Sequence, residues 1–420
     1  MNAEVIAVGT ELLMGQIANT NAQYISKKIQ ETGINVFHHS VVGDNRKRLH
    51  DLLAAAFQRS DLVILTGGLG PTQDDLTKES VAEYFGLKLV LHEDILQRII
   101  AFFEKIGRRM TENNAKQAYF PEGCIVLGNE FGTAPGCIVE NSGKTAVLLP
   151  GPPREMCPIF DNSVIPFLKN KSDHKFVSKY LKIFGIGESA LETELIDLIK
   201  NQTNPTIATY AGNYEVTLRV TARAASEEEA EALIKPVIEQ IDNKIGRFIY
   251  SKENKSIEET IAHLLIRNNI TLSIAESCTG GLIASKLTNV PGISAVFDRA
   301  IVSYSNRSKI ENLNVRQETI EKHGAVSEET AIEMASGILS ISGTSIGLSI
   351  TGIAGPEGGS MEKPVGLVYI AVTDGEKCEC KKLTLSGDRD RIRNLSTMQA
   401  FYMLWKFIRS RFVSPEADRE

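Results

Sequence analysis

The 420-residue sequence has no apolar run long enough to cross a membrane, and its longest apolar stretches have the length of single strands. Residues 1–6, Met-Asn-Ala-Glu-Val-Ile, lack the basic flank and apolar core of a signal peptide. These two absences disfavour a membrane-spanning or secreted protein. We therefore expect a cytoplasmic protein.

Cysteines and histidines are few and scattered. The six cysteines form no Cys-x-x-Cys pair, and the seven histidines form no His-x-x-x-His or Cys/His cluster. This pattern disfavours a structural zinc site. In a chain of this length it is typical of reduced thiols in a cytosol.

The sequence also lacks a basic excess, because 46 lysines and arginines face 52 aspartates and glutamates, giving a net charge of −6. A duplex-binding surface usually needs clustered positive charge, so we expect no direct contact with nucleic acid. The composition, 42% hydrophobic and 23% charged, is typical of folded protein. A chain of this length exceeds one ordinary core and predicts two to four domains.

Residues 1–170 alternate near-continuous apolar strands with helix patterns. This alternation predicts a parallel sheet covered by helices on both faces. Residues 171–250 change rhythm and predict a small βαββαβ sandwich, with a hairpin across Gly212-Asn213. A polar run at residues 251–256 is typical of a linker.

The remaining segment, residues 256–415, returns to strand and helix alternation and ends in a long predicted helix at residues 390–411. We expect the tail at residues 414–420 to be disordered.

The motif Ala-Glu-Ser-Cys-Thr-Gly-Gly at residues 275–281 lies between an apolar run and a helix pattern. A serine in such a turn, Ser277, can present its hydroxyl to a substrate. The N–H groups of Thr279, Gly280 and Gly281 would face an oxyanion. Cys278 competes as the nucleophile, although a buried small thiol is the alternative interpretation of that residue.

No histidine offers an obvious base for Ser277, and no Gly-x-Ser-x-Gly elbow occurs. Serine can instead use a lysine whose pKa is lowered by burial. Tyr304 and Lys309 follow a strand pattern that begins at Ala300, and both are candidate partners. Taken alone, Lys309 has the alternative of being an ordinary surface lysine.

A glycine run, Gly67-Gly68-Leu69-Gly70-Pro71-Thr72, follows a buried strand pattern and precedes Asp74-Asp75. Such a run lets backbone N–H groups approach phosphates, and carboxylates beyond it could hold a divalent cation. Asp44, at the end of the neighbouring strand, could join them, and Gly151 follows another strand. The alternative is that one aspartate simply caps the helix that starts at Thr77.

Four other loops contain glycine or arginine motifs. The glycine-rich residues 351–359 follow a buried strand and suit a phosphate or ribose, and arginines within residues 386–393 could clamp a phosphate or simply lie on the surface. Gly-x-Gly-x-x-Ala at residues 185–190 is better explained as a helix cap, because no acid follows to hold a ribose. Residues 141–145 end like a Walker A loop but predict a hairpin turn.

Taken together, these motifs resemble the CinA family (competence/damage-inducible protein A) over nearly the whole chain. The last segment resembles its PncC-type nicotinamide-nucleotide amidohydrolase domain, the first resembles the MoaB/MogA-like molybdopterin-binding fold, and the middle one a KH-like domain. The expected fold class is therefore α/β in three domains, at residues 1–170, 171–250 and 256–415.

The resemblance implies two hydrolytic activities of pyridine-nucleotide recycling. Ser277 and Lys309, assisted by Tyr304, would deamidate nicotinamide mononucleotide without a metal. Asp44 and Asp75 would hold a divalent metal (Mg, Mn or Co) for hydrolysis of ADP-ribose to AMP and ribose 5-phosphate. A homodimer is also implied. The expected substrate contacts are Thr279, Gly280, Gly281, Thr351, Gly352, Gly355 and Arg393 in the last segment, and Gly67, Gly68, Gly70, Thr72 and Gly151 in the first.

Two other functions stay open from the sequence. One is a molybdopterin-binding or adenylyltransferase-like module, although the usual Gly-Gly-Thr-Gly of that fold is Gly-Gly-Leu-Gly here, with Leu69 in place of threonine. The other is a competence-related scaffold protein, for which the acidic net charge disfavours direct DNA contact.

Overall fold

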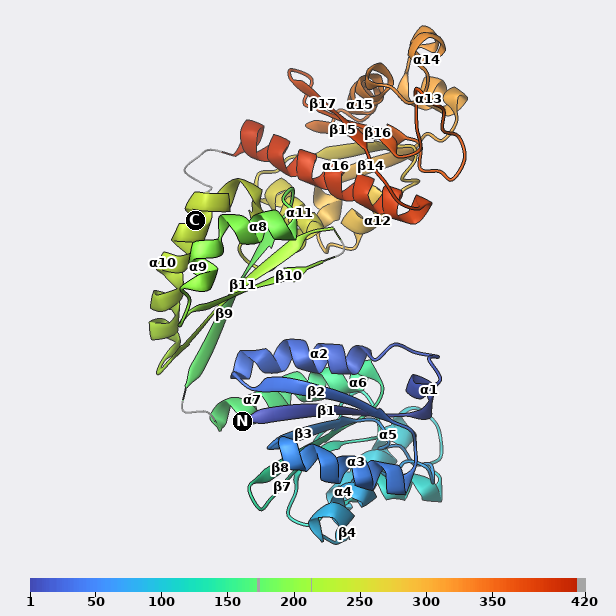
Figure 1. Cartoon of the computed structure of the whole chain (residues 1–420). Helices are drawn as coiled ribbons and strands as arrows, with labels where there is room; N and C mark the ends of the chain where they lie inside the picture. Colours follow the sequence, from blue (N-terminus) through green and yellow to red (C-terminus); the bar gives the residue numbers. More distant parts are fainter. Residues whose placement is uncertain (172–173, 213, 414–420) are drawn as a thin grey trace. The chain divides into compact units, whose positions relative to one another are not determined.

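The computed structural model describes residues 1–171, 174–212 and 214–413 (Figure 1). The predicted disordered tail at residues 414–420 and the turn residue Asn213 lie outside the described residues. The chain forms two compact units, one mainly from residues 1–178 and one mainly from residues 179–221 and 234–413. Within the described residues, no helix is both long and apolar enough to cross a lipid bilayer.

The first unit contains a six-stranded sheet in the order β2-β1-β3-β8-β7-β6. The first four strands are parallel, as predicted, and the last two are added antiparallel. The antiparallel edge arises because Ser142 and Gly143 adopt left-handed backbone conformations and make the predicted hairpin turn. The strands are β1 (Asn2–Val8), β2 (Asn35–Val42), β3 (Leu62–Thr66), β6 (Ile125–Leu127), β7 (Gly136–Asn141) and β8 (Lys144–Leu149), with a separate pair β4 (Leu89–Leu91) and β5 (Tyr119–Pro121).

Helices cover both faces of this sheet because its strand residues alternate between two apolar cores. Ile6 and Leu65 pack with helices α3, α4 and α5, whereas Val5 and Ile64 pack with α2, α6 and α7. The parallel strands therefore all point their carboxyl ends to one edge, where ligands bind in such folds. The helices are α1 (Thr10–Leu13), α2 (Thr20–Ile29), α3 (Arg46–Arg59), α4 (Thr77–Phe85), α5 (Glu93–Lys105), α6 (Pro153–Ile159) and α7 (Ile165–Asn170).

The middle segment forms a four-stranded sheet in the order β10-β11-β9-β12, with its helices inserted as the sequence predicted. The Gly-x-Gly turn starts α8 at Glu188, which agrees with its interpretation as a helix start. The elements are β9 (Lys175–Ile183), α8 (Glu188–Glu194), α9 (Ile196–Lys200), β10 (Thr206–Ala211), β11 (Val216–Ala224), α10 (Glu227–Ile245) and β12 (Ile249–Ser251).

The last segment is a five-stranded sheet in the order β14-β13-β15-β16-β17, parallel over the first three strands and antiparallel beyond. Ile274 of β13 packs with α11, α12 and α16, whereas the next residue, Ala275, packs with α15 on the other face. The carboxyl end of β13 thus lies between two parallel neighbours. The strands are β13 (Leu272–Glu276), β14 (Phe297–Val302), β15 (Ile346–Gly352), β16 (Leu367–Thr373) and β17 (Cys378–Thr384); the helices are α11 (Ile257–Arg267), α12 (Leu282–Thr288), α13 (Asn306–Leu313), α14 (Gln317–His323), α15 (Glu328–Ser342) and α16 (Arg389–Phe412).

Candidate functional site

The turn after β13 is held by the buried carboxylate that ends the strand. Glu276 accepts hydrogen bonds from the backbone N–H groups of Gly281 at 2.9 Å, Ile283 at 3.2 Å and Ala284 at 2.9 Å. These donors belong to the first turn of α12, where a carboxylate is favoured by unpaired N–H groups and by the helix dipole. Gly280 and Gly281 have positive φ angles of 62° and 92°, which lets the chain reverse between strand and helix. Glu276 therefore fixes the backbone that carries Ser277.

The prediction that three successive N–H groups face an oxyanion is wrong for both glycines. The Gly280 N–H donates to the Ser277 carbonyl at 3.0 Å, and the Gly281 N–H donates to Glu276. The physical reason is that the buried Glu276 carboxylate already satisfies the helix N-terminus. Of the three N–H groups expected to face an oxyanion, that of Thr279 remains. The carbonyl of the same residue accepts a hydrogen bond from the Arg393 Nη2 at 2.7 Å.

Ser277 and Lys309 meet in a buried pair. The Lys309 Nζ donates to the Ser277 Oγ at 3.0 Å and to the Ser303 carbonyl at 2.7 Å. Lys309 is 2% exposed and Ser277 is 7% exposed, so the surface-lysine alternative is excluded. Ser305 caps helix α13 through the Ser308 N–H, and this brings Lys309 into the first turn of the helix.

Burial shifts the pKa values of Lys309 and Cys278 in opposite directions. It lowers the pKa of Lys309 to about 8, because an ammonium loses its hydration in the interior. It raises the pKa of the Cys278 thiol to about 12, so that thiol stays protonated at neutral pH. The arrangement therefore favours Ser277 as the nucleophile and a neutral Lys309 as its base.

Tyr304 does not join this pair. Its side chain is 62% exposed, and its hydroxyl accepts a hydrogen bond from Arg389 Nη2 at 2.8 Å. In the described part of the chain, no hydrogen bond connects Tyr304 with Ser277 or Lys309. The other nitrogen of the fork, Arg389 Nη1, donates to the Gly355 carbonyl at 2.6 Å. The sequence left Arg389 open as a phosphate clamp or a surface charge; in the structure it links Tyr304 to the loop that contains Gly355.

Thr351 lies at the end of β15, directly beside the turn that carries Ser277. The Ser277 N–H donates to the Ile350 carbonyl at 3.0 Å, and the Thr351 Oγ1 donates to the Ala325 carbonyl at 2.7 Å. Gly352 packs tightly, since a Cβ there would lie 2.7 Å from a Val368 methyl group. Thr351 is therefore near Ser277, whereas packing against Val368 requires a glycine at position 352.

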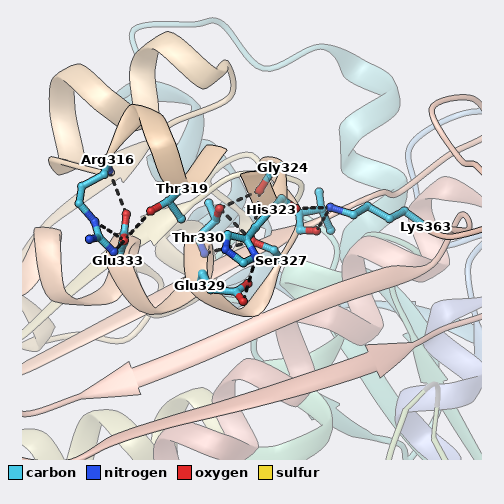
Figure 2. A network of polar contacts seen from close by, with 10 residues as sticks. Arg316, Thr319, His323, Gly324, Ser327, Glu329, Thr330, Glu333 and Lys363 are labelled. Atoms are coloured by element: carbon cyan, nitrogen blue, oxygen red, sulfur yellow. Dashed lines mark hydrogen bonds and ion pairs between the residues drawn. The ribbon is translucent and has the colours of Figure 1, made fainter. Parts of the chain in front are cut away.

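A polar network holds the loop that supports Thr351 (Figure 2). Lys363, from the glycine-rich loop, donates its Nζ to the carbonyls of His323 and of Val326, the latter at 2.8 Å. These carbonyls flank Ala325, which accepts the hydrogen bond from Thr351. The contacts of residues 323–327 could not be predicted from residue types, because backbone carbonyls make them.

All N-terminal residues expected at a site line one cavity of about 390 Å³. The Asp44 Oδ2 accepts hydrogen bonds from the Thr10 N–H at 2.9 Å and the Thr10 Oγ1 at 2.8 Å. The Asp75 Oδ2 accepts one from the Thr72 N–H at 2.9 Å. Helix α4 has Leu76 at its N-cap without a side-chain cap, so the capping alternative for the aspartates is wrong. The expected residues in the cavity wall are Asp44, Gly67, Gly68, Gly70, Thr72, Asp75 and Gly151.

The glycine run is required by close backbone approach. A Cβ at Gly67 would lie 2.1 Å from the Val8 carbonyl oxygen, and one at Gly70 would lie 2.4 Å from the Asp75 Oδ2. The loop can therefore pack against β1 and under Asp75 only without side chains at these positions.

Three further acids, Glu11, Asp74 and Glu155, also line this cavity. Glu155 is buried and accepts a hydrogen bond from the Asn129 Nδ2 at 2.6 Å. Within the described residues, no group of three histidines, cysteines or acids is placed to hold a metal ion. Mg²⁺ commonly uses one or two carboxylates together with substrate phosphates and water. Asp44 and Asp75 therefore fit a cation that is shared with a phosphorylated ligand.

Comparison with protein families divides the chain into three matched regions. The family described as "CinA C-terminal domain" matches residues 254–408, "Probable molybdopterin binding domain" matches residues 4–170, and "Damage-inducible protein CinA KH domain" matches residues 178–251. The expected fold class, α/β in three domains, is confirmed.

Curated relatives match this chain over nearly their whole length. A CinA-like protein of Kosmotoga olearia is 55% identical over 400 residues, covering 95% of this chain and 97% of that protein. A CinA-like protein of Dictyoglomus turgidum is 53% identical over 404 residues, covering 96% and 98%. Among solved structures, competence/damage inducible protein CihA from Agrobacterium tumefaciens is 41% identical, covering 36% of this chain and 94% of that chain with a TM-score of 0.34.

Proposed function

The chain belongs to the CinA family, and from this premise we propose that its C-terminal domain is a nicotinamide-nucleotide amidase. The observation that carries the proposal is the buried pair in which the Lys309 Nζ lies 3.0 Å from the Ser277 Oγ. A desolvated lysine beside a serine hydroxyl is the arrangement that activates serine without histidine. The substrate is nicotinamide mononucleotide, and the products are nicotinate mononucleotide and ammonia.

The reaction proceeds in two halves. The neutral Lys309 takes the proton from the Ser277 Oγ, which attacks the carboxamide carbon. Lys309 then returns that proton to the leaving nitrogen. Ammonia departs, and the acyl group remains on Ser277 as an ester. In the second half, Lys309 takes a proton from water, which attacks the ester and releases the acid while the proton returns to Ser277. The Ser303 carbonyl keeps the lysine amine directed at the serine.

We assign the oxyanion to the Thr279 N–H, because the N–H groups of Gly280 and Gly281 are engaged elsewhere. Arg389 and Arg393 lie in the first turns of α16 and contact the loops around the serine through Gly355 and Thr279. Their guanidinium groups suit the phosphate of the nucleotide.

The pH dependence should report the lysine. Because burial lowers the pKa of Lys309 to about 8 and the neutral amine is the active form, kcat/KM should rise with pH and level off above about 8. At pH 7 only about a tenth of the enzyme would be active. Ammonia release measured from pH 6 to 10 checks this expectation, and a flat or falling profile over that range would contradict it.

Glu276 should act as a positioning residue. In Glu276→Gln the amide nitrogen would face N–H donors, so the turn should shift and kcat should fall about 10-fold or more while KM changes little. The measurement is steady-state deamidation together with the melting temperature. Glu259→Gln, at the capping box of α11, is the matched control and should affect only stability. Unchanged kcat in Glu276→Gln would remove the positioning role.

For the N-terminal domain we propose metal-dependent hydrolysis of ADP-ribose to AMP and ribose 5-phosphate. The support is one cavity that combines a glycine run at a strand end with Asp44 and Asp75. Asp44 and Asp75 would hold a divalent cation, which supplies Lewis-acid polarisation of a pyrophosphate when bound. The backbone N–H groups of Gly68 and Gly70 would bind the phosphates, because the Gly67 N–H already donates to the Leu149 carbonyl at 2.9 Å.

The test is the double variant Asp44→Asn, Asp75→Asn. We expect release of AMP from ADP-ribose to fall at least about 100-fold, because both cation-binding carboxylates are lost. Ammonia release from nicotinamide mononucleotide in the same preparation should be unchanged and serves as the folding control. Persistent AMP release would exclude this site, and adenylylation of a pterin without ADP-ribose cleavage would favour the adenylyltransferase alternative.

A further inference from the structure

One lysine of the first unit directs its whole ammonium group at the loop that carries Asp75. Lys116 lies in a short 3₁₀ helix (Glu112–Ala118), and its Nζ donates to the Thr72 carbonyl at 3.0 Å and to the Asp75 carbonyl. The same Nζ lies 3.3 Å from the Glu79 Oε1, in the first turn of α4. An ammonium has three hydrogen-bond donors, and these three partners use all of them. Lys116 is therefore held against the loop.

The two carbonyls that Lys116 holds belong to the first and last residues of a tight turn. The Asp75 N–H donates back to the Thr72 carbonyl at 3.3 Å, and the Asp75 Oδ2 accepts hydrogen bonds from both the N–H and the Oγ1 of Thr72. The position of the carboxylate is thus set by the backbone of this turn. Thr72 and Asp75 line the N-terminal cavity, whereas Lys116 does not, so the lysine holds the turn without entering the cavity.

A second lysine fixes the chain that carries Lys116. Lys78 of α4 is buried, its Nζ donates to the carbonyls of Lys116 at 3.1 Å and Gln117 at 3.0 Å, and it lies 4.4 Å from the centre of the Phe120 ring. The Gln117 side chain is also buried, and its Nε2 donates to the Leu69 carbonyl in the glycine run at 3.4 Å. The 3₁₀ helix is therefore joined both to α4 and to the glycine run, and Lys116 has a fixed base.

Lys116 has two opposing effects on a cation at Asp75. Its positive charge repels the cation, whereas its hydrogen bonds hold the turn that carries the carboxylate. The repulsion is weakened, because Glu79 pairs with the ammonium at 3.3 Å and because five acids line the cavity. The hydrogen bonds are strong, because their donor is charged. We therefore expect the hydrogen bonds to determine the net effect. The five acids are Glu11, Asp44, Asp74, Asp75 and Glu155.

We propose that Lys116 is a positioning residue that raises the affinity of Asp44 and Asp75 for a divalent cation; the inference rests on the proposed function of the N-terminal domain. The ammonium contacts neither the cation nor the substrate, and it acts through the turn from Thr72 to Asp75. Without these hydrogen bonds the turn can relax and move the Asp75 carboxylate. Replacing a residue that orients a metal ligand commonly weakens metal binding about 10- to 100-fold.

Binding of Mn²⁺ to the full-length protein tests the proposal, and electron paramagnetic resonance of the free ion measures it without turnover. The relevant site is the saturable binding that is lost in Asp44→Asn, Asp75→Asn. Lys116→Met should weaken this binding about 10-fold. Lys116→Arg should stay within about 3-fold of the parent, because a guanidinium can also donate to both carbonyls. Lys105→Met, at an exposed lysine that ends α5, is the matched control and should bind like the parent.

The direction of the change separates positioning from other roles. A lysine that acted only through its charge would give tighter Mn²⁺ binding in Lys116→Met, and a merely structural lysine would lower the melting temperature at unchanged affinity. Either result would overturn the proposal, as would equal weakening in Lys116→Met and Lys116→Arg. Lys116→Gln, a shorter donor, should also bind more weakly than the parent, and it decides the test if Lys116→Met does not melt cooperatively.

Failure of this inference and failure of the proposed function give different results. If Asp44→Asn, Asp75→Asn binds Mn²⁺ like the parent, the cation site itself is wrong, and the proposed hydrolysis of ADP-ribose and the role of Lys116 are both excluded. If that variant loses the binding while Lys116→Met retains parental affinity, the cation site stands and only the positioning role is excluded.

Discussion

Ser277→Ala is expected to lower kcat for ammonia release from nicotinamide mononucleotide by at least about 10³-fold. The substitution removes the oxygen that forms the ester and leaves Lys309 with its second partner, the Ser303 carbonyl. The fold should be unaffected, because the lost group is one hydroxyl. Steady-state assay of ammonia at saturating substrate, together with the melting temperature, measures both expectations.

The matched control is the neighbouring residue. Cys278→Ala should keep kcat within a few-fold of the parent, because burial raises the pKa of the thiol and keeps it protonated. The opposite pattern, with activity retained in Ser277→Ala and lost in Cys278→Ala, would assign the reaction to the cysteine and contradict the proposed mechanism.

Lys309→Met is expected to have an effect of similar size. Methionine keeps most of the apolar volume but removes the only base within hydrogen-bonding distance of the Ser277 Oγ among the described residues. Because the two groups act as one unit, the double variant with Ser277→Ala should be no slower than either single variant. Lys322→Met on α14, which is exposed, is the control. Appreciable activity in Lys309→Met, or strictly additive losses, would exclude lysine as the base.

The serine turn could be predicted from sequence because its signals are local. An apolar strand, two glycines and a helix pattern follow one another between residues 272 and 288, and the structure places Ser277 in the turn between strand and helix. The role of the glycines could not be predicted, since it depends on where the Glu276 side chain points. A signal was present, because an acid a few residues before a helix N-terminus often accepts its free N–H groups.

The burial of Lys309 could not be predicted, because it results from tertiary packing. In sequence the residue follows a polar stretch, whereas in the fold the cap at Ser305 starts α13 and turns the lysine under the end of β13. For Tyr304, the contact that the sequence suggested is not made. Its proximity in sequence suggested contact with the serine, but its hydroxyl contacts Arg389 of the distant helix α16.

The pairing of the strands could also be predicted only in part. Near-continuous apolar strands predict parallel pairing, and this is confirmed for the strands at the centre of both larger sheets. The antiparallel edges β6-β7 and β16-β17 could not be inferred from apolar runs, because hairpins depend on turn geometry. Glu155 was missed because it is 80 residues from Asp75 in sequence and reaches the same cavity only through the parallel strand order.

The most direct test of the central claim is ammonia release by the full-length protein incubated with nicotinamide mononucleotide in excess EDTA. We predict equal amounts of ammonia and nicotinate mononucleotide at the rate seen without EDTA, and no release by Ser277→Ala. Loss of the activity on addition of EDTA, or release of free nicotinamide in place of ammonia, would contradict a metal-independent amidase built on Ser277 and Lys309.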